Sequence, residues 1–145
     1  MPPSSTPPRR RHDPALGVTT LLESHFHHYL DYAGLLMPPE DVPLAVRTAV
    51  TEVAACWQSV LAAPDAAAAT WRLVRAALAG RAGPRALAPV AHLTTDQQDV
   101  VLMRHALGWS DDTIITVTGA DRCALAAAAR SVARIAAERS CQETP

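Results

Sequence analysis

The chain has 145 residues, enough for one ordinary domain or two very small ones. Hydrophobic residues make up 49% and aromatic residues only 4%, which excludes a core built on large rings, and 29 residues are alanine. Because alanine is the best helix former and buries little apolar surface, this composition predicts closely packed helices of modest stability. The net charge of −1 excludes a strong overall attraction to nucleic acid or to an anionic membrane.

The sequence also indicates a compartment. No apolar run reaches the roughly 18 residues of a membrane span, and the arginines near the start are not followed by the apolar stretch of a secretory signal. Cys56, Cys123 and Cys141 are an odd number at wide spacings. Together these features predict a cytoplasmic protein whose thiols are reduced and mostly buried.

In the first third of the chain the sequence predicts a tail followed by a helix. Residues 1–18 are rich in proline and contain three consecutive arginines, which predicts a disordered, solvated tail. A capping box formed by Thr20 and Glu23 places the start of the first helix at Thr19 or Thr20. Pro38 and the proline after it end this helix.

Two more helices are expected before residue 81. Asp41 is the expected cap of the second helix, which runs to about Ala63 with Leu44 and Cys56 on its buried side. The third helix runs from about Ala66 to Ala79, and Gly80 ends it. Residues 81–92 mix glycine, proline and alanine without periodicity, so they read as a linker between two helical modules, 19–80 and 93–138.

The second module has the layout of a helix-turn-helix. A helix follows Thr94 and ends at Gly108, and Ser110 caps a short helix that ends at Gly119. Asp121 then caps a long helix to about residue 138, which leaves 139–145 as a tail. Helical spacing predicts a core for this module: Val100, Met103, Leu107, Ile114, Val117, Leu125 and Val132.

An ordered set of residues supports this layout. Leu93 opens the module, an apolar run ends in Arg104, the triplet 108–110 precedes the short helix, and Gly119 and Asp121 flank the turn. In this order, residues 93–137 resemble region four of the extracytoplasmic-function sigma factors of bacterial RNA polymerase. The resemblance implies a helix-turn-helix whose last helix meets the −35 promoter element.

Residues 19–80 are more faintly similar to region two of the same family, through Tyr29, the run Asp31 to Ala33, and Trp57 and Trp71. The resemblance implies contacts with the polymerase core or with a regulatory protein partner. The charged residues in the corresponding places are Glu40, Asp41, Glu52, Arg72 and Arg75. The usual glutamine and acid of the polymerase-docking surface are replaced, since Val50 and Thr51 stand there.

The expected recognition helix departs from the family at its reading positions. Ala126, Ala127 and Ala128 stand where the family has polar and basic residues, and a methyl group cannot make the bidentate bonds that identify guanine or adenine. Arg122, Arg130 and Arg134 share one face at about 100° per residue and could meet phosphates. Asp111 and Asp112 lie near that face and oppose phosphate approach. The predicted DNA-binding residues are Arg122, Ala126, Ala127, Arg130 and Arg134.

Other chemistry is weakly represented. His25, His27 and His28 form a cluster, but no further ligand follows at metal-site spacing, so solvent-facing histidines are expected rather than a metal site. Cys123 lies in the first turn of the last helix, where the helix dipole lowers a thiol pKa, but an inert thiol is the simpler interpretation. We expect neither catalytic residues nor a cofactor, and neither a small-molecule substrate nor a membrane contact.

The sequence therefore predicts an all-α protein of two small helical modules. The predicted function is a sigma-factor-like transcriptional regulator that binds DNA weakly through its helix-turn-helix and contacts RNA polymerase. A second hypothesis is a degenerate sigma-like module that binds a regulatory protein without reading promoter DNA. A third is a helical scaffold unrelated to transcription.

Overall fold

The structure is a computed structural model that describes residues 14–143, and every regular element within them is helical. The predicted all-α fold class is therefore confirmed. In chain order the elements are α1 (Pro14–Gly34), α2 (Val42–Ala55), α3 (Trp57–Ala62), α4 (Ala66–Ala79), the 3₁₀ turn η1 (Ala88–Val90), α5 (Thr95–Val100), the π-helical segment η2 (Val101–Ala106), α6 (Asp111–Thr118) and α7 (Arg122–Gln142). No helix in this part of the chain combines the length and apolar character of a membrane span.

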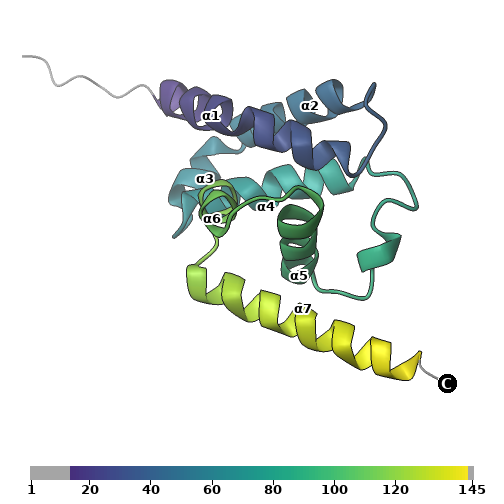
Figure 1. Cartoon of the computed structure of the whole chain (residues 1–145). Helices are drawn as coiled ribbons and strands as arrows, with labels where there is room; N and C mark the ends of the chain where they lie inside the picture. The colour runs from purple at the N-terminus through teal and green to yellow at the C-terminus, as the bar shows by residue number, and fades with distance from the viewer. Residues whose placement is uncertain (1–13, 144–145) are drawn as a thin grey trace, which may run out of the picture.

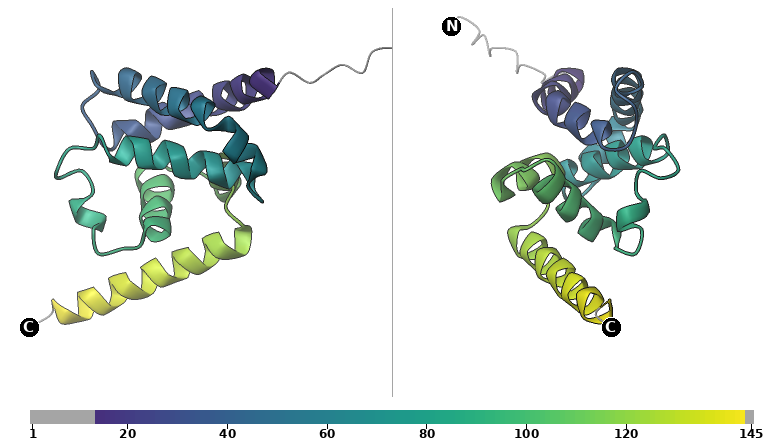
Figure 2. Two further views of the ribbon diagram at one scale, coloured as in Figure 1. Left: turned by 180° about the vertical axis from the view of Figure 1, so that it is seen from behind. Right: turned by 45° about the vertical axis from the view of Figure 1, so that its right-hand side comes forward.

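The helices are arranged around α4. α1 and α2 pack against each other at the top of Figure 1, and α4 packs under α2 in the centre. α5 runs from α4 toward α7, which lies along the opposite edge, and both views of Figure 2 show the same order. α6 contacts α4 on one side and α7 on the other, so the α6–α7 segment is joined directly to the first half of the chain.

Several predicted boundaries are wrong. The tail predicted for residues 1–18 stops earlier, since α1 begins at Pro14, and residues 1–13, with the three arginines, lie outside the described residues. Proline is favoured in the first turn of a helix because its fixed φ is already helical, so Pro14 starts the helix. At the other end, α7 continues through most of the predicted tail, to Gln142.

The predicted second helix is broken at Cys56, where the backbone has φ −99° and ψ 12°. The chain turns there and continues as α3, which packs against α4 and buries Val60. The expected inward side of this helix is also wrong at two positions. The Leu44 side chain is 63% exposed, and Cys56 is exposed as well.

One core serves both halves of the chain. Buried residues of α1, α2 and α4 belong to the same cluster as Val100, Met103, Ile114, Val117 and Leu125, whereas Leu107 and Val132 are only half-buried. The expected linker is also fixed, because the Gly83 amide donates to the Leu36 carbonyl at 3.0 Å and Val90 is buried. Within residues 14–143, one cluster of buried side chains therefore includes residues of both predicted modules.

A buried aspartate ties the two halves together. Asp99 of α5 accepts hydrogen bonds from the Tyr32 hydroxyl (2.8 Å), the Trp71 indole (3.0 Å) and the Arg75 Nε (2.8 Å). Arg75 also donates to Gln98 at 2.8 Å. The side chains of Arg75 and Asp99 are only 12% and 11% exposed. Burial and the Asp99 charge raise the pKa of Tyr32, so its hydroxyl stays a donor.

Removing this carboxylate is expected to destabilise the whole fold. Asp99→Ala leaves the guanidinium, indole and hydroxyl without their acceptor, and breaking such a buried pair costs about 3–5 kcal/mol. Asp96→Ala, one turn earlier and exposed, is the matched control and costs less than about 1 kcal/mol. Urea unfolding followed by circular dichroism measures both variants, and equal losses would contradict the role assigned to Asp99.

Candidate nucleic-acid interface

The turn between α6 and α7 is built by local signals. The Ser110 hydroxyl accepts from the Thr113 amide at the start of α6, and Gly119 ends that helix with a left-handed φ of 67°. The Asp121 carboxylate then accepts from the amides of Cys123 and Ala124 and caps α7. Because glycine adopts a positive φ without strain and aspartate is a strong N-cap, these residues fix the angle at which α7 leaves the turn.

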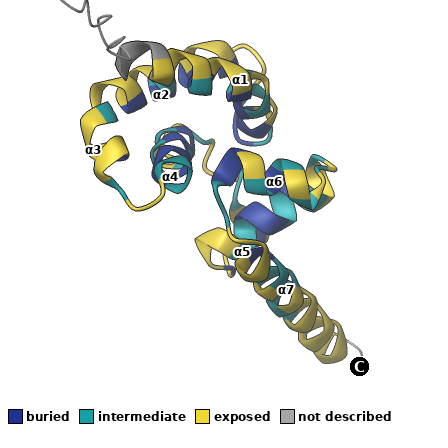
Figure 3. Cartoon of the chain, turned by 90° about the vertical axis from the view of Figure 1, so that its left-hand side faces the viewer, coloured by how far each residue is buried: buried dark blue, intermediate teal, exposed yellow. Residues whose placement is uncertain are grey.

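α7 presents most of its surface to solvent. Leu125 is its one buried residue, and Figure 3 shows exposed colour along most of the helix. Of the predicted DNA-binding residues, Arg122, Ala127, Arg130 and Arg134 are exposed and Ala126 is half-buried. The helix therefore exposes the four-residue face that a duplex would meet.

Acidic side chains neutralise part of this face. Arg122 forms an ion pair with Asp112, and Arg134 forms one with Glu138 at 3.3 Å. The hydrogen bond that Arg122 donates to Asp112, together with the negative charge of Asp112, raises the pKa of Arg122. Arg130 makes no ion pair within residues 14–143. Of the three arginines, Arg130 is therefore the one without an acidic partner among the described residues.

The acids expected to repel DNA are themselves paired. Asp111 accepts from Arg104 at 2.5 Å and Asp112 from Arg122, so the start of α6 carries two mutually compensated ion pairs. The local charge near α7 is consequently closer to neutral than either the arginines or the aspartates suggest alone. Exposed ion pairs of this kind are weak and are screened by salt, so a phosphate can compete for the arginine.

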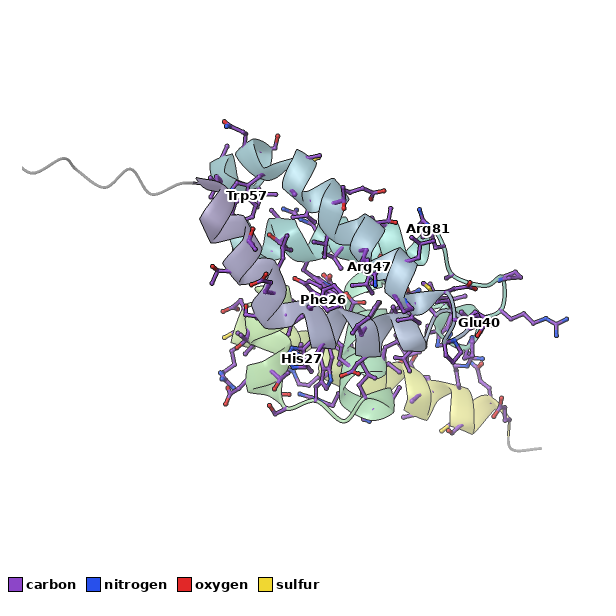
Figure 4. The ribbon with its side chains drawn as sticks, turned by 90° about the horizontal axis from the view of Figure 1, so that it is seen from above. Phe26, His27, Glu40, Arg47, Trp57 and Arg81 are labelled. Atoms are coloured by element: carbon purple, nitrogen blue, oxygen red, sulfur yellow. The ribbon has the colours of Figure 1, made fainter. Side chains whose placement is uncertain are left out.

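The residues predicted to contact polymerase or another partner divide into two groups. Glu40, Asp41, Glu52 and Arg72 are exposed. Figure 4, viewed from above, places Glu40 at the turn between α1 and α2, whereas α7 lies along the opposite edge of the molecule in Figure 1. Arg75 is the exception, because its guanidinium lies inside the fold against Asp99. A side chain held there is not available to a partner.

The expected cap at Asp41 is only partly present. Asp41 is the N-cap residue of α2 and its carbonyl accepts from the Ala45 amide, but its carboxylate makes no capping hydrogen bond. Its backbone is in the helical region, with φ −89° and ψ −19°, and capping needs an extended conformation. The Asp41 carboxylate therefore points to solvent without a local role.

The expectation of solvent-facing histidines holds for His27, which is exposed, but not for its two neighbours. His25 is buried, His28 is half-buried, and His28 meets the ring of Trp109 edge-on at 4.9 Å between centroids. The Nδ1 atoms of both are buried and have no hydrogen-bond partner among the described residues. No group of three or more histidine, cysteine, aspartate or glutamate side chains in residues 14–143 is arranged to hold a metal ion. His28 instead joins α1 to the loop before α6 through Trp109, while His25 packs against His28 and Tyr29 of its own helix.

The thiols differ from the sequence expectation in the opposite direction, since they are more exposed than predicted. Cys56, Cys123 and Cys141 are free and all three are exposed, so the prediction of mostly buried thiols is wrong. Cys56 is turned outward by the break after α2, and Cys123 and Cys141 lie on the exposed surface of α7. None of them forms a disulfide bond with another described cysteine.

Asp99 is the residue that sequence reasoning missed. It occurs in the run Gln98-Asp99-Val100, and it lies one turn before Met103, which is fully buried. A charged residue on the apolar side of a helix predicts a buried partner, because an unpaired buried charge is very costly. That signal, together with Arg75 in the preceding helix, was available in the sequence.

The buried histidines predict a loss of stability in acid. Burial, and then the charge of His27, lower the pKa of His25, and the same causes act on His28, where Asp31 opposes them. Because the unfolded chain binds protons more readily, their contribution is complete above about pH 6.5 and declines as the pH falls below that value. We expect the urea concentration at the unfolding midpoint to be lower at pH 5.5 than at pH 7.5.

His25→Leu should show a smaller fall over this interval, since it removes one of the two titrating groups. His105→Gln, at an exposed position, is the control and should follow the parent chain. A His25→Leu chain as acid-sensitive as the parent would show that other groups cause the effect.

Comparison of the chain with protein-family models, with curated protein sequences and with solved structures found no match. The candidate interface therefore rests on its own geometry: two capped helices, α6 and α7, joined by a turn, with an exposed arginine face on α7 that acids partly neutralise.

Proposed function

We propose that the chain is a sigma-factor-like transcriptional regulator whose helix-turn-helix sets α7 against the DNA backbone. The observation that supports this most is the exposed face of α7, with Arg130 unpaired between Arg122 and Arg134. Arginines on one face of a helix fit phosphates, which position a protein on a duplex without identifying its sequence.

The proposed contact is weak and largely independent of sequence. Ala126 and Ala127 offer only methyl groups to base edges, and each missing bidentate contact gives up roughly 1–3 kcal/mol of discrimination between bases. Any selectivity would then come from a second protein, such as the polymerase core, bound through the exposed acids at the far edge of the molecule. Glu40 and Asp41 at the α1–α2 turn, and Glu52 on α2, are the exposed acids there.

A second function, binding a regulatory protein in place of DNA, is favoured by one specific observation. Two of the three arginines already have acidic neighbours on the protein, and Ala126 and Ala127 lie between Arg122 and Arg130. A smooth face of small side chains with compensated charge suits close packing against another helix better than it suits a polyanion.

The salt dependence of duplex binding tests the DNA proposal. Each neutralised phosphate contributes about −0.9 to the slope of log K against log salt, so one free arginine predicts a slope near −0.9 and three predict about −2.7. Asp112→Asn releases Arg122 and should steepen the slope to about −1.8. Fluorescence anisotropy of a labelled duplex measures it.

Glu23→Gln, at an exposed position of α1, changes the net charge by the same amount and is the matched control. It should leave the slope unchanged. Equal steepening by both variants would mean that net charge, rather than the α7 face, governs binding, and no measurable binding by any variant would contradict the DNA proposal.

A pair of substitutions separates the two functions. If α7 meets DNA, Arg130→Ala with Arg134→Ala should abolish regulation, measured as transcript levels in cells that produce the full chain. If α7 meets a protein, Ala127→Trp should abolish it, since added bulk in a close helix contact costs about 1–3 kcal/mol. Loss with the tryptophan alone would contradict the DNA proposal, and loss with the arginine variants alone would contradict the protein-binding alternative.

A further inference from the structure

A cavity of about 360 Å³ lies where α4, α5, α6 and α7 meet. Its apolar wall is formed by Trp71, Val100, Ile114 and Leu125, and its polar groups belong to Arg72, Asp96 and Asp99. The volume is near the lower end of the roughly 300–1,000 Å³ that ligand pockets span. An apolar wall with a few convergent charges is the usual composition of a site for a small molecule.

The cavity exists because small side chains face each other across a fixed frame. Ala68 of α4 and Ala124 and Ala128 of α7 line it and leave the space between the helices unfilled. The frame cannot collapse at the turn, where a Cβ on Gly119 would come within 2.4 Å of the Ala68 amide nitrogen. It is held at the other side by the 2.9 Å hydrogen bond from Gln97 to Ser131.

The lining of the cavity carries both signs of charge. The Oδ2 atom of buried Asp99 accepts one hydrogen bond from within residues 14–143, from Trp71, which leaves acceptor capacity on that oxygen. Asp96 lies one turn away on α5 and also lines the cavity. Neither Asp96 nor Arg72 forms an ion pair with another described residue.

We propose that this cavity binds a free α-amino acid with a large apolar side chain. The ammonium group donates to Asp99 and Asp96, the carboxylate accepts from Arg72, and the side chain fills the space against Trp71 and Leu125. A ligand with one charge would leave part of this set unmatched, whereas a zwitterion matches both signs. The inference does not depend on the proposed DNA contact, because the cavity lies on the inner side of α7.

The assignment is tested by calorimetric titration of the full chain with L-leucine, L-methionine, L-phenylalanine and L-tryptophan. At least one should bind and raise the melting temperature. For phenylalanine, two analogues each remove one charge: phenethylamine lacks the carboxylate, and 3-phenylpropionate lacks the ammonium group. Each lost charge-assisted hydrogen bond should weaken binding roughly tenfold or more.

Variants place the ligand in the cavity. Ala128→Leu fills the space and should abolish binding, whereas Ala133→Leu, at an exposed position of the same helix, should leave it unchanged. Arg72→Gln tests the carboxylate contact without changing the cavity volume greatly, and should bring the affinity of the amino acid down to that of its amine. Circular dichroism of each variant verifies that the helices are retained.

Three results would overturn the proposal. One is failure of all four amino acids to bind the parent chain. Another is equal binding by phenethylamine and phenylalanine, which would make the site specific for amines. The third is equal binding by the Ala128→Leu and Ala133→Leu variants. All of these readouts are independent of duplex binding, so they do not bear on the DNA proposal.

Discussion

The buried carboxylate of Asp99 is the constraint on which the rest of the structure depends. It is bound by α1 through Tyr32 and by α4 through Trp71 and Arg75, although it belongs to α5 in the second half of the chain. Apolar packing tolerates sliding and rotation, whereas three directional hydrogen bonds to one carboxylate fix both the position and the rotation of α5. The placement of α6 and α7 follows from it, because α6 packs on α4 and α7 packs on α5.

These contacts reduce the number of arginines that are available to a polyanion. Arg75 serves the interior, and Arg122 and Arg134 have acidic partners, so a count of arginines overstates the charge available to a polyanion. An ion pair between an exposed arginine and a nearby Asp or Glu changes the stability of the fold little. The carboxylate of that pair nevertheless competes directly with phosphate for the same guanidinium. The proposed DNA contact is therefore modest in strength for a structural reason, in addition to the alanines at the reading positions.

Elements governed by local chemistry could be predicted from the sequence. The bounds of α4, the Ser110 and Asp121 caps and the turn at Gly119 agree with expectation, because each depends on the conformational preference of a few adjacent residues. Features set by distant contacts could not. The break at Cys56, after which α3 packs on α4, and the contact of His28 with Trp109 depend on neighbours in other elements.

The candidate interface was predictable to a similar extent. Helical periodicity placed Arg122, Arg130 and Arg134 on one exposed face, as the structure has them. The ion pairs of these arginines and the burial of Arg75 depend on tertiary contacts, which leave no periodic pattern in the sequence. The cavity beside Trp71 could not be predicted from the sequence either, because it is the space left between alanines of α4 and α7, two helices that are distant along the chain.

The π-helical segment η2 has a consequence for how this sequence can change. Its wider turns, seen in the hydrogen bond from the Leu107 amide to the Leu102 carbonyl at 3.0 Å, accommodate one residue more than an α-helix would over the same span. Deleting a single residue there would let the segment close as an ordinary α-helix over the same span, so α6 and α7 would keep their placement relative to Asp99. Loss of this one residue is thus the length change that the segment tolerates best, whereas an insertion or a longer deletion would turn α6 and α7 relative to Asp99 by about 100° for each residue.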